Sequence, residues 1–317
     1  MRFPASLPVL LCALLFASYQ TPEASTKATE TVEGVVSTLV RDLPGGTGGL
    51  EVDKEGFVYS ADFGSKLGAG SQGGNLLFKI HPVSGEFEIF ANVLRGASGN
   101  AIGPSGDFFQ SNIGANTISR ITPAGEVSTF LKRELKSPVG IVIDEDGLLF
   151  VANCGGQRIL EVTPEGEPAE ICASPLLKCP NGITLDVDHN MYVANFGNGD
   201  VIKITPDGEA SRLATLPGNN NGHLVHRDGK LYVVARSAHQ IYEVSLEGKV
   251  QLLAGSGKRG HDDGPLLKAS FSFPNDLAFS PDGKLLYVNE NAQIEGPGGD
   301  LSPMTVRAIR LAEPQQE

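Results

Sequence analysis

The stretch SPVGIVIDEDGLLFVAN, from Ser137 to Asn153, contains the pattern that decides the fold of this chain. Its apolar residues from Gly140 to Ile143 predict a β-strand, and DEDG predicts a tight turn in which glycine adopts a positive φ. Residues Leu148 to Ala152 then predict a second strand. The stretch RILEVTPEGE, which begins at Arg158, adds a third strand and a turn, and a fourth short strand follows. One copy of the pattern therefore predicts a four-stranded antiparallel sheet.

The same pattern occurs six times in the 317 residues. The other copies begin at Thr47, Ala97, Cys179, Asn220 and Phe273. A repeat length of about 40 to 50 residues is typical of the blades of a β-propeller, and the 39 glycines and 20 prolines indicate many turns. We therefore predict an all-β, six-bladed β-propeller with four antiparallel strands per blade.

The sixth copy lacks a fourth strand after its third strand, which we predict at Met304 to Leu311. The stretch GVVSTLV, from Gly34 to Val40, resembles the fourth strand of the second copy, GEVSTFL, yet it precedes the first copy. Without a partner, the third strand of blade six would leave an open sheet edge. We therefore expect this N-terminal strand to complete blade six and close the ring.

The residues before the first repeat resemble an export signal followed by a linker. A short apolar run from Leu7 to Phe16 is too short to span a bilayer, and it ends at the small residues Ala17 and Ser18. The following residues, rich in Thr, Glu, Ala and Ser, have little to bury. For a secreted or periplasmic protein we predict a signal peptide over 1–17, a flexible linker over 18–33, the propeller over 34–312 and a tail over 313–317.

The charge and the hydropathy of the chain limit its partners. A net charge of −12 and a pI near 5.0 disfavour nucleic acid, because phosphate binding needs concentrated Lys and Arg. No later stretch resembles a transmembrane segment. We expect a small-molecule ligand, keep a protein partner as an alternative, and expect no membrane span.

Removal of the signal peptide would leave Cys154, Cys172 and Cys179. An odd number leaves at least one free thiol or one that pairs with another chain. Cys172 and Cys179 flank the connection between blades three and four, and Cys154 is expected near Cys179 on the same face. We favour the Cys172–Cys179 pair, with Cys154–Cys179 as the alternative.

The repeat predicts a ligand site on the face where the first strand of each blade begins and the second strand ends. Three long segments reach this face, Asp62–Asn75 in blade one, Ala254–Phe273 before blade six and Glu290–Pro303 within blade six. Loops of this length in a compact repeat fold usually shape a binding mouth.

Polar side chains at the start of the inner strands concentrate on blades four, five and six. The inner strands of these blades open with Asn181, Asn221 and Asn275, and strand alternation places His223 and Asn100 on the same side as such residues. The asparagines either bind a ligand or metal or bond the backbone at blade junctions. His223 is a candidate general base, because imidazole titrates near neutrality, or a structural histidine.

Further candidates stand where the second strands end, at Asp62, Asn195 and Glu290. Such residues usually close turns, but Asp62 and Glu290 adjoin the long loops. We take Asp62, Asn100 and Asn195 as ligand-binding candidates. Alternation points Glu51 away from the channel.

These features resemble the superfamily of six-bladed propellers that includes gluconolactonase and senescence-marker-protein-like hydrolases, with NHL-repeat proteins as relatives. The stretch LLAGSGKRGHDDGPLLKASFSFPNDLAF, from Leu252 to Phe279, is NHL-like, and inner strands start in the gluconolactonase manner at Asn181 and Asn275. The likeness covers Gly34 to Ala312. It implies Ca²⁺ or another divalent ion at the channel mouth, held by a Glu, by Asn residues and by an Asp.

Carried over by position, Asn181 matches a metal-binding asparagine, and Asn221 stands at the aspartate position. Gly48 replaces the glutamate and Val139 the other asparagine, so the carboxylate charge that hard cations prefer is missing. Asp276 and Glu290 are the nearest anions. The metal-ligand candidates are Asn181, Asn221, Asn275 and Glu290.

Two hypotheses follow. The resemblance implies a metal-assisted lactone or ester hydrolase, in which the ion polarises the carbonyl and activates water while His223 accepts a proton. The alternative is a non-catalytic, NHL-like propeller that binds a small ligand or a protein. The loss of metal-binding side chains at Gly48 and Val139 favours the non-catalytic propeller. The resemblance to the superfamily also extends to the location of the pocket, and for this reason we place the hydrolase slightly ahead.

Overall fold

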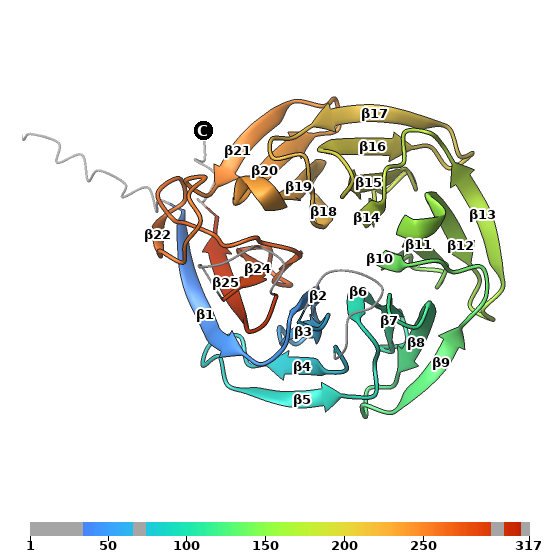
Figure 1. Ribbon diagram of the computed structural model, residues 1–317, viewed down its shortest axis with the longest axis horizontal. Coiled ribbons are helices and arrows are strands. Elements are labelled where there is room, and N and C mark those ends of the chain that lie inside the picture. Colours follow the sequence, from blue (N-terminus) through green and yellow to red (C-terminus); the bar gives the residue numbers. More distant parts are fainter. Residues whose placement is uncertain (1–33, 66–73, 293–300, 312–317) are drawn as a thin grey trace, which may run out of the picture. The chain divides into compact units, whose positions relative to one another are not determined.

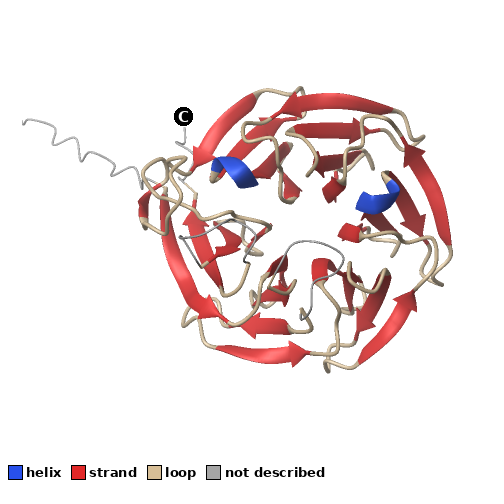
Figure 2. Cartoon of the chain, viewed as in Figure 1, coloured by secondary structure: helices blue, strands red, loops and turns tan. Residues whose placement is uncertain are grey.

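The computed structural model describes residues 34–65, 74–292 and 301–311. These residues form an all-β ring of six blades, and their only helical turns are Cys154–Gly156 and Arg236–Ala238 (Figures 1 and 2). No helix in these three ranges is long and apolar enough to span a membrane. The predicted signal peptide, linker and tail lie outside the described residues, as do parts of two long loops.

The first three blades follow the repeats in chain order, each with its strands side by side. Blade one contains β2 (Thr47–Val52), β3 (Val58–Asp62), β4 (Leu77–Ile80) and β5 (Phe87–Ala91). Blade two contains β6 (Ala97–Ile102), β7 (Phe108–Asn112), β8 (Thr117–Ile121) and β9 (Val127–Leu131). Blade three contains β10 (Pro138–Ile143), β11 (Leu149–Asn153), β12 (Arg158–Val162) and β13 (Pro168–Ala173).

The next two blades repeat this order. Blade four contains β14 (Pro180–Leu185), β15 (Met191–Asn195), β16 (Asp200–Ile204) and β17 (Ala210–Thr215). Blade five contains β18 (Leu224–Arg227), β19 (Lys230–Ala235), β20 (Gln240–Ser245) and β21 (Val250–Ala254). The six-bladed prediction is confirmed.

Blade six combines both ends of the described chain, as we predicted. Its own strands are β23 (Leu277–Phe279), β24 (Leu285–Asn291) and β25 (Met304–Arg310). Strand β1 (Val35–Leu43) pairs antiparallel with β25, and the short β22 (Gly264–Pro265) pairs with the outer edge of β1 (Figure 1). The closing strand is therefore longer than the sequence likeness indicated.

Strand β1 also contributes to two different hydrophobic cores. Val36 is fully buried in the core that blade six shares with Tyr232 and Val234 of blade five. Leu43 is fully buried in the core that blade six shares with Phe78 and other residues of blade one. The strand therefore fastens blade six to both of its neighbours.

The disulfide joins Cys154 to Cys179, so the pairing we favoured is wrong and the alternative is correct. Cys172 is free and buried, because its side chain on β13 packs into the core beside Ile159 and Leu177. Cys154 follows β11 and Cys179 precedes β14, so the bridge links blades three and four. Such bridges persist in oxidising compartments.

The closing strand provides a stability test. Replacing Leu43 by Ala (Leu43→Ala) leaves a cavity between blades six and one, and we expect a loss of about 2–5 kcal/mol in the free energy of unfolding. Val83→Ala is the matched control, because Val83 is 85% exposed and its loss should change stability by less than about 0.5 kcal/mol. Urea denaturation followed by circular dichroism measures both. Equal effects of the two substitutions would contradict the closing role of β1.

Candidate functional site

A cavity of about 270 Å³ occupies the channel and is lined by residues from or beside all six inner strands. On blade two these residues are Asn100, Ala101 and Ile102, the second half of the strand. Asn100 is buried, whereas Ile102 and Phe279 are partly exposed. The cavity therefore opens at the turns between first and second strands. The binding mouth that we predicted lies at the opposite end of the channel, where the first strands begin. Its long loops include residues outside the described ranges.

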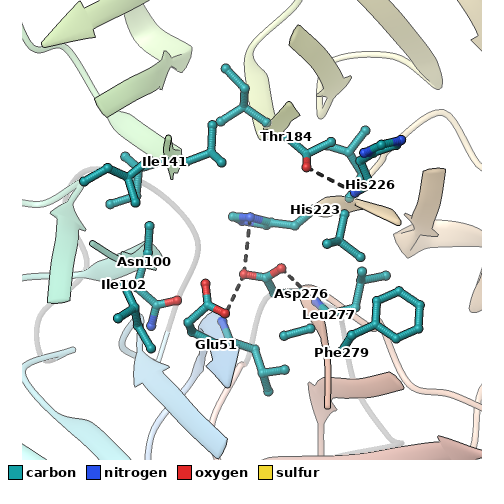
Figure 3. A pocket seen from close by; sticks show the side chains of 18 of the residues that line it. Glu51, Asn100, Ile102, Ile141, Thr184, His223, His226, Asp276, Leu277 and Phe279 are labelled. Atoms are coloured by element: carbon teal, nitrogen blue, oxygen red, sulfur yellow. Dashed lines mark hydrogen bonds and ion pairs between the residues drawn. The ribbon is translucent and has the colours of Figure 1, made fainter. Parts of the chain in front are cut away.

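The two sides of the cavity differ in chemistry (Figure 3). Most polar lining residues come from four consecutive blades, five, six, one and two; they are His223, His226, Arg227, Asp276, Glu51 and Asn100, and Thr184 of blade four adds a hydroxyl. Blades three and four contribute mainly aliphatic side chains, which include Ile141, Ile143 and Ile183. A ligand in this cavity would meet a hydrogen-bonding side and an apolar side.

Asp276 and His223 are held in place by the backbone. Asp276 Oδ2 lies 3.3 Å from His223 Nδ1 and accepts a hydrogen bond from the Leu50 amide, and Asp276 Oδ1 accepts one from the Leu277 amide. The His223 amide donates to the Asn275 carbonyl. His223 Nε2 makes no protein hydrogen bond within the described part of the chain, and the ring extends into the cavity (Figure 3).

Glu51 lies beside Asp276, and its Oε1 accepts a hydrogen bond from the Val52 amide (Figure 3). Burial raises the pKa of Glu51 to about 7, and the nearby Asp276 carboxylate adds to this increase. Burial also raises the pKa of Asp276 to about 7. Near neutral pH the two carboxyl groups can therefore hold one proton between them, so that one accepts a proton while the other donates one.

A neighbouring carboxylate ordinarily raises the pKa of a histidine, but the pKa of His223 is lowered. Burial lowers its pKa to about 3, and the positive charge of Arg236 contributes. The imidazole is therefore neutral near pH 7, with the Nε2 lone pair facing the cavity when Nδ1 carries the proton.

Our prediction that Glu51 points away from the channel is wrong. The inner strand is the edge of its sheet, so side chains from both of its faces border the channel. The pairing of β2 with β3 is also irregular between Thr47 and Leu50, which disturbs alternation counted from Gly48. Asp276 is absent from our predicted site, although it is one of the two nearest anions in the sequence. Its position directly after Asn275, at the start of an inner strand, was the available signal.

Asn100 lines the cavity as a buried amide with 6% of its surface exposed. Neither Nδ2 nor Oδ1 has a hydrogen-bond partner among the described residues. Buried side-chain amides are nearly always hydrogen-bonded in folded proteins. Asn100 therefore has a donor and an acceptor available for a molecule in the cavity.

The three asparagines that open inner strands bond the backbone of neighbouring segments. Asn181 Nδ2 donates to the Asn221 carbonyl, Asn221 Nδ2 to the Asp200 carbonyl, and Asn275 Nδ2 to the Gly48 carbonyl. Asn275 Oδ1 also accepts a hydrogen bond from Arg236. These donor contacts match the structural alternative, and the three side chains do not belong to the lining of the channel cavity. Asn221 Oδ1 is buried without a partner among the described residues.

The candidates at the ends of second strands also have protein partners. Asp62 accepts hydrogen bonds from the amides of Gly46 and Gly64. Asn195 accepts one from the Lys178 amide and donates one to the Leu176 carbonyl.

Glu290 is fully buried in a separate ionic cluster. Its Oε1 lies 2.7 Å from an Arg307 nitrogen and 2.8 Å from His261 Nδ1, and its Oε2 accepts a hydrogen bond from the Ser272 amide. Both oxygens are therefore engaged in binding blade six to the segment that precedes it.

The donors present do not fit the divalent-metal site that the resemblance implied. Hard cations need several oxygen ligands, with carboxylates among them. Gly48 and Val139 offer no side-chain donor, Asn275 uses both ends of its amide, and Glu290 is paired with Arg307. The described ranges contain no group of three His, Cys, Asp or Glu side chains that could hold a metal ion.

Comparisons with known proteins show the fold. No protein-family model and no curated protein matches the sequence. Among solved structures, a gluconolactonase from Xanthomonas campestris has a TM-score of 0.67 and 14% identity, over 89% of this chain and 90% of its own. Virginiamycin B lyase from Staphylococcus aureus has a TM-score of 0.59 and 17% identity, over 88% and 100%.

An auxiliary nutrient binding protein from Bacteroides thetaiotaomicron is also similar, with a TM-score of 0.67 and 13% identity over 87% of this chain and 76% of its own. Identities this low establish a shared architecture and no activity. The chain is thus a six-bladed propeller with the architecture of gluconolactonase.

The raised carboxyl pKa values can be measured by infrared difference spectroscopy between about pH 5 and about pH 9. We expect a protonated-carboxyl absorption that disappears with a midpoint of about 7. Asp276→Asn and Glu51→Gln should each remove part of it. Asp107→Asn is the control, because hydrogen bonds from Ser105 and Arg120 outweigh burial and lower the Asp107 pKa. Complete carboxyl ionisation in the wild type by about pH 5 would contradict the assignment.

The same shifts predict how stability depends on pH. Between the ordinary carboxyl range and about pH 7, the native state keeps protons that the unfolded state has released, so the free energy of unfolding falls as pH rises. His223 acts in the opposite direction between about pH 3 and the ordinary histidine pKa of 6.5. In urea denaturation, the free energy of unfolding of Asp276→Asn should therefore fall less than that of the wild type as pH rises toward 7.

Proposed function

We propose that the channel cavity hydrolyses a small lactone or ester by general acid–base catalysis. The observation that carries this proposal is the placement of two carboxyl groups with pKa values of about 7 beside a histidine in one cavity. Ester hydrolysis needs a base that takes a proton from water and an acid that protonates the leaving alkoxide. The gluconolactonase from Xanthomonas campestris, which shares the fold, supports the choice of lactones.

Asp276 is the group better suited to ionise, because two backbone amides donate to its oxygens. An ionised Asp276 would accept a hydrogen bond from Nδ1–H of His223, which keeps the proton on Nδ1 and leaves Nε2 free to take a proton from water. A histidine with a low pKa is a weak base, so this transfer depends on the negative charge of Asp276 to stabilise the imidazolium.

Glu51 would then act as the acid. The water oxygen forms a bond to the carbonyl carbon while its proton passes to His223 Nε2. The carbon–alkoxide bond breaks, and the alkoxide takes the proton of Glu51. Transfer of the His223 proton back to Glu51 through solvent restores the site. Because Asp276 must be ionised and Glu51 protonated, the rate should be highest near pH 7 and fall on both sides.

A second candidate is the capture of a small polar molecule without turnover. The unpartnered amide of Asn100 favours it, and so does the low basicity of His223. The nutrient binding protein of similar fold supports this alternative.

A panel of lactones and aryl esters tests the proposal. Asp276→Asn and Glu51→Gln should each lower kcat by about 10²- to 10⁴-fold, since each removes one proton-transfer group. Glu145→Gln is the matched control, because Glu145 is an exposed carboxylate on the turn of blade three at the same end of the ring. Turnover should persist in a chelator.

Three results would overturn the proposal that the cavity hydrolyses lactones or esters. The first is an absence of turnover across the panel, and the second is full activity in both carboxyl variants. The third is activity that is lost in a chelator and restored by Ca²⁺. Thermal stabilisation by a panel compound that is never hydrolysed would instead support the second candidate.

A further inference from the structure

We propose that Asn100 selects the substrate, and that it does so by binding a hydroxyl group next to the reacting carbonyl. The inference rests on the proposed hydrolysis in the same cavity. It assigns to that cavity a substrate class, the 2-hydroxy esters and lactones with an aliphatic substituent.

The first observation is that both ends of the Asn100 side-chain amide lack a partner, whereas the donors of its polar neighbours are engaged; among these neighbours Gln110 Oε1, on the facing residue of β7, also lacks one in the described ranges. Gln110 Nε2 donates to the carbonyls of Ser98 and Gly99, and Ser111 Oγ donates to Gly99 and Val139 carbonyls. Asn100 Nδ2 and Oδ1 are buried without a partner in the described part of the protein. Since no neighbouring group takes up this donor and acceptor, a molecule in the cavity is their natural partner.

The second observation is that the amide is confined. A Cβ atom at Gly49 would lie 2.4 Å from the Ser98 carbonyl oxygen, 2.8 Å from Asn100 Oδ1 and 2.8 Å from the backbone nitrogen of Asn100. Glycine at position 49 therefore provides the space that the Asn100 side chain occupies. Asn100 and Glu51 both belong to the polar side of the cavity (Figure 3).

The chemistry of the amide then defines what it binds. Its NH2 group offers two N–H donors and its C=O one acceptor oxygen, and the planar amide fixes them relative to each other. A hydroxyl next to a carbonyl offers the complementary acceptor and donor. The Asn100 N–H would bind the carbonyl oxygen, where negative charge develops during attack by water, and Oδ1 would accept from the hydroxyl.

The opposite wall limits the rest of the molecule. Ile141, Ile143 and Ile183 offer no side-chain hydrogen-bonding groups. The Thr184 hydroxyl, which accepts a hydrogen bond from the His226 amide, leaves one O–H donor on this wall. A sugar lactone, with hydroxyl groups around its ring, would leave several of them unpaired against this wall. A lactone with one hydroxyl and an aliphatic face fits both sides.

Pantolactone is a suitable probe, because it has one hydroxyl next to its carbonyl and two methyl groups. Wild-type kcat/KM for pantolactone should exceed that for the same lactone without the hydroxyl by about 100-fold or more, because a missing hydroxyl leaves the amide unpaired. It should also exceed that for gluconolactone. Asn100→Ala should reduce the ratio between the first two lactones to near one. Asn190→Ala, a turn asparagine of blade four, should keep the wild-type ratio.

Asn100→Asp separates the two contacts while keeping the size of the side chain. It retains an acceptor for the hydroxyl but loses the donor to the carbonyl, so kcat should fall more than KM rises. An unchanged ratio in Asn100→Ala, with circular dichroism like that of the wild type, would overturn the inference.

A binding experiment distinguishes failure of this inference from failure of the proposed hydrolysis. The probes are the lactam analogue of pantolactone and the same lactam without the hydroxyl, measured by calorimetry. If the wild type hydrolyses no lactone, the proposed function fails. Tighter binding of the hydroxylated lactam by wild type but not by Asn100→Asp or Asn100→Ala would still support Asn100. Equal binding of both lactams by the wild type, or no binding of either, would overturn it.

Discussion

The pairing of β1 with β25 is the constraint on which the rest of the molecule depends. A ring of blades has no gap only if its last sheet is completed, and here strands separated by most of the chain complete it. Val36 and Leu43 carry the same strand into the cores on either side of blade six. This arrangement brings the inner strands of blades six and one together. As a result, Asp276 and Glu51, 225 positions apart in the sequence, become neighbours in one cavity.

Ring closure also explains the unusual electrostatics of the cavity. Inner strands are sheet edges, and their free backbone amides are available to carboxylates on the adjacent blade, as the Leu50 amide is to Asp276. The same closeness shields Glu51, Asp276 and His223 from water. It raises the pKa of both carboxyl groups and lowers the pKa of His223, so that each group favours its uncharged form. A buried group without an oppositely charged partner is costly for stability, and such groups often mark functional sites.

Much of the fold could be predicted from sequence because each blade carries its own local signals. The turn in DEDG and the strands around it depend on neighbouring residues only, and the likeness of Gly34–Val40 to a fourth strand revealed the closure. His223 and Asn100 were placed near the channel by the same register. The direction of Glu51 and the partner of Cys179 could not be obtained in this way. Both depend on how blades pack side by side, which no single repeat encodes.

We propose that the working site is the channel cavity, at the end where the first and second strands of each blade are joined. A crystal structure of the Glu51→Gln variant with a bound lactone or its hydroxy acid tests this claim most directly. We expect the ligand carbonyl between Asn100 and His223, and the apolar side of the ligand toward Ile141 and Ile183. A ligand bound at the opposite mouth, around Asn181 and Asn221, would contradict it.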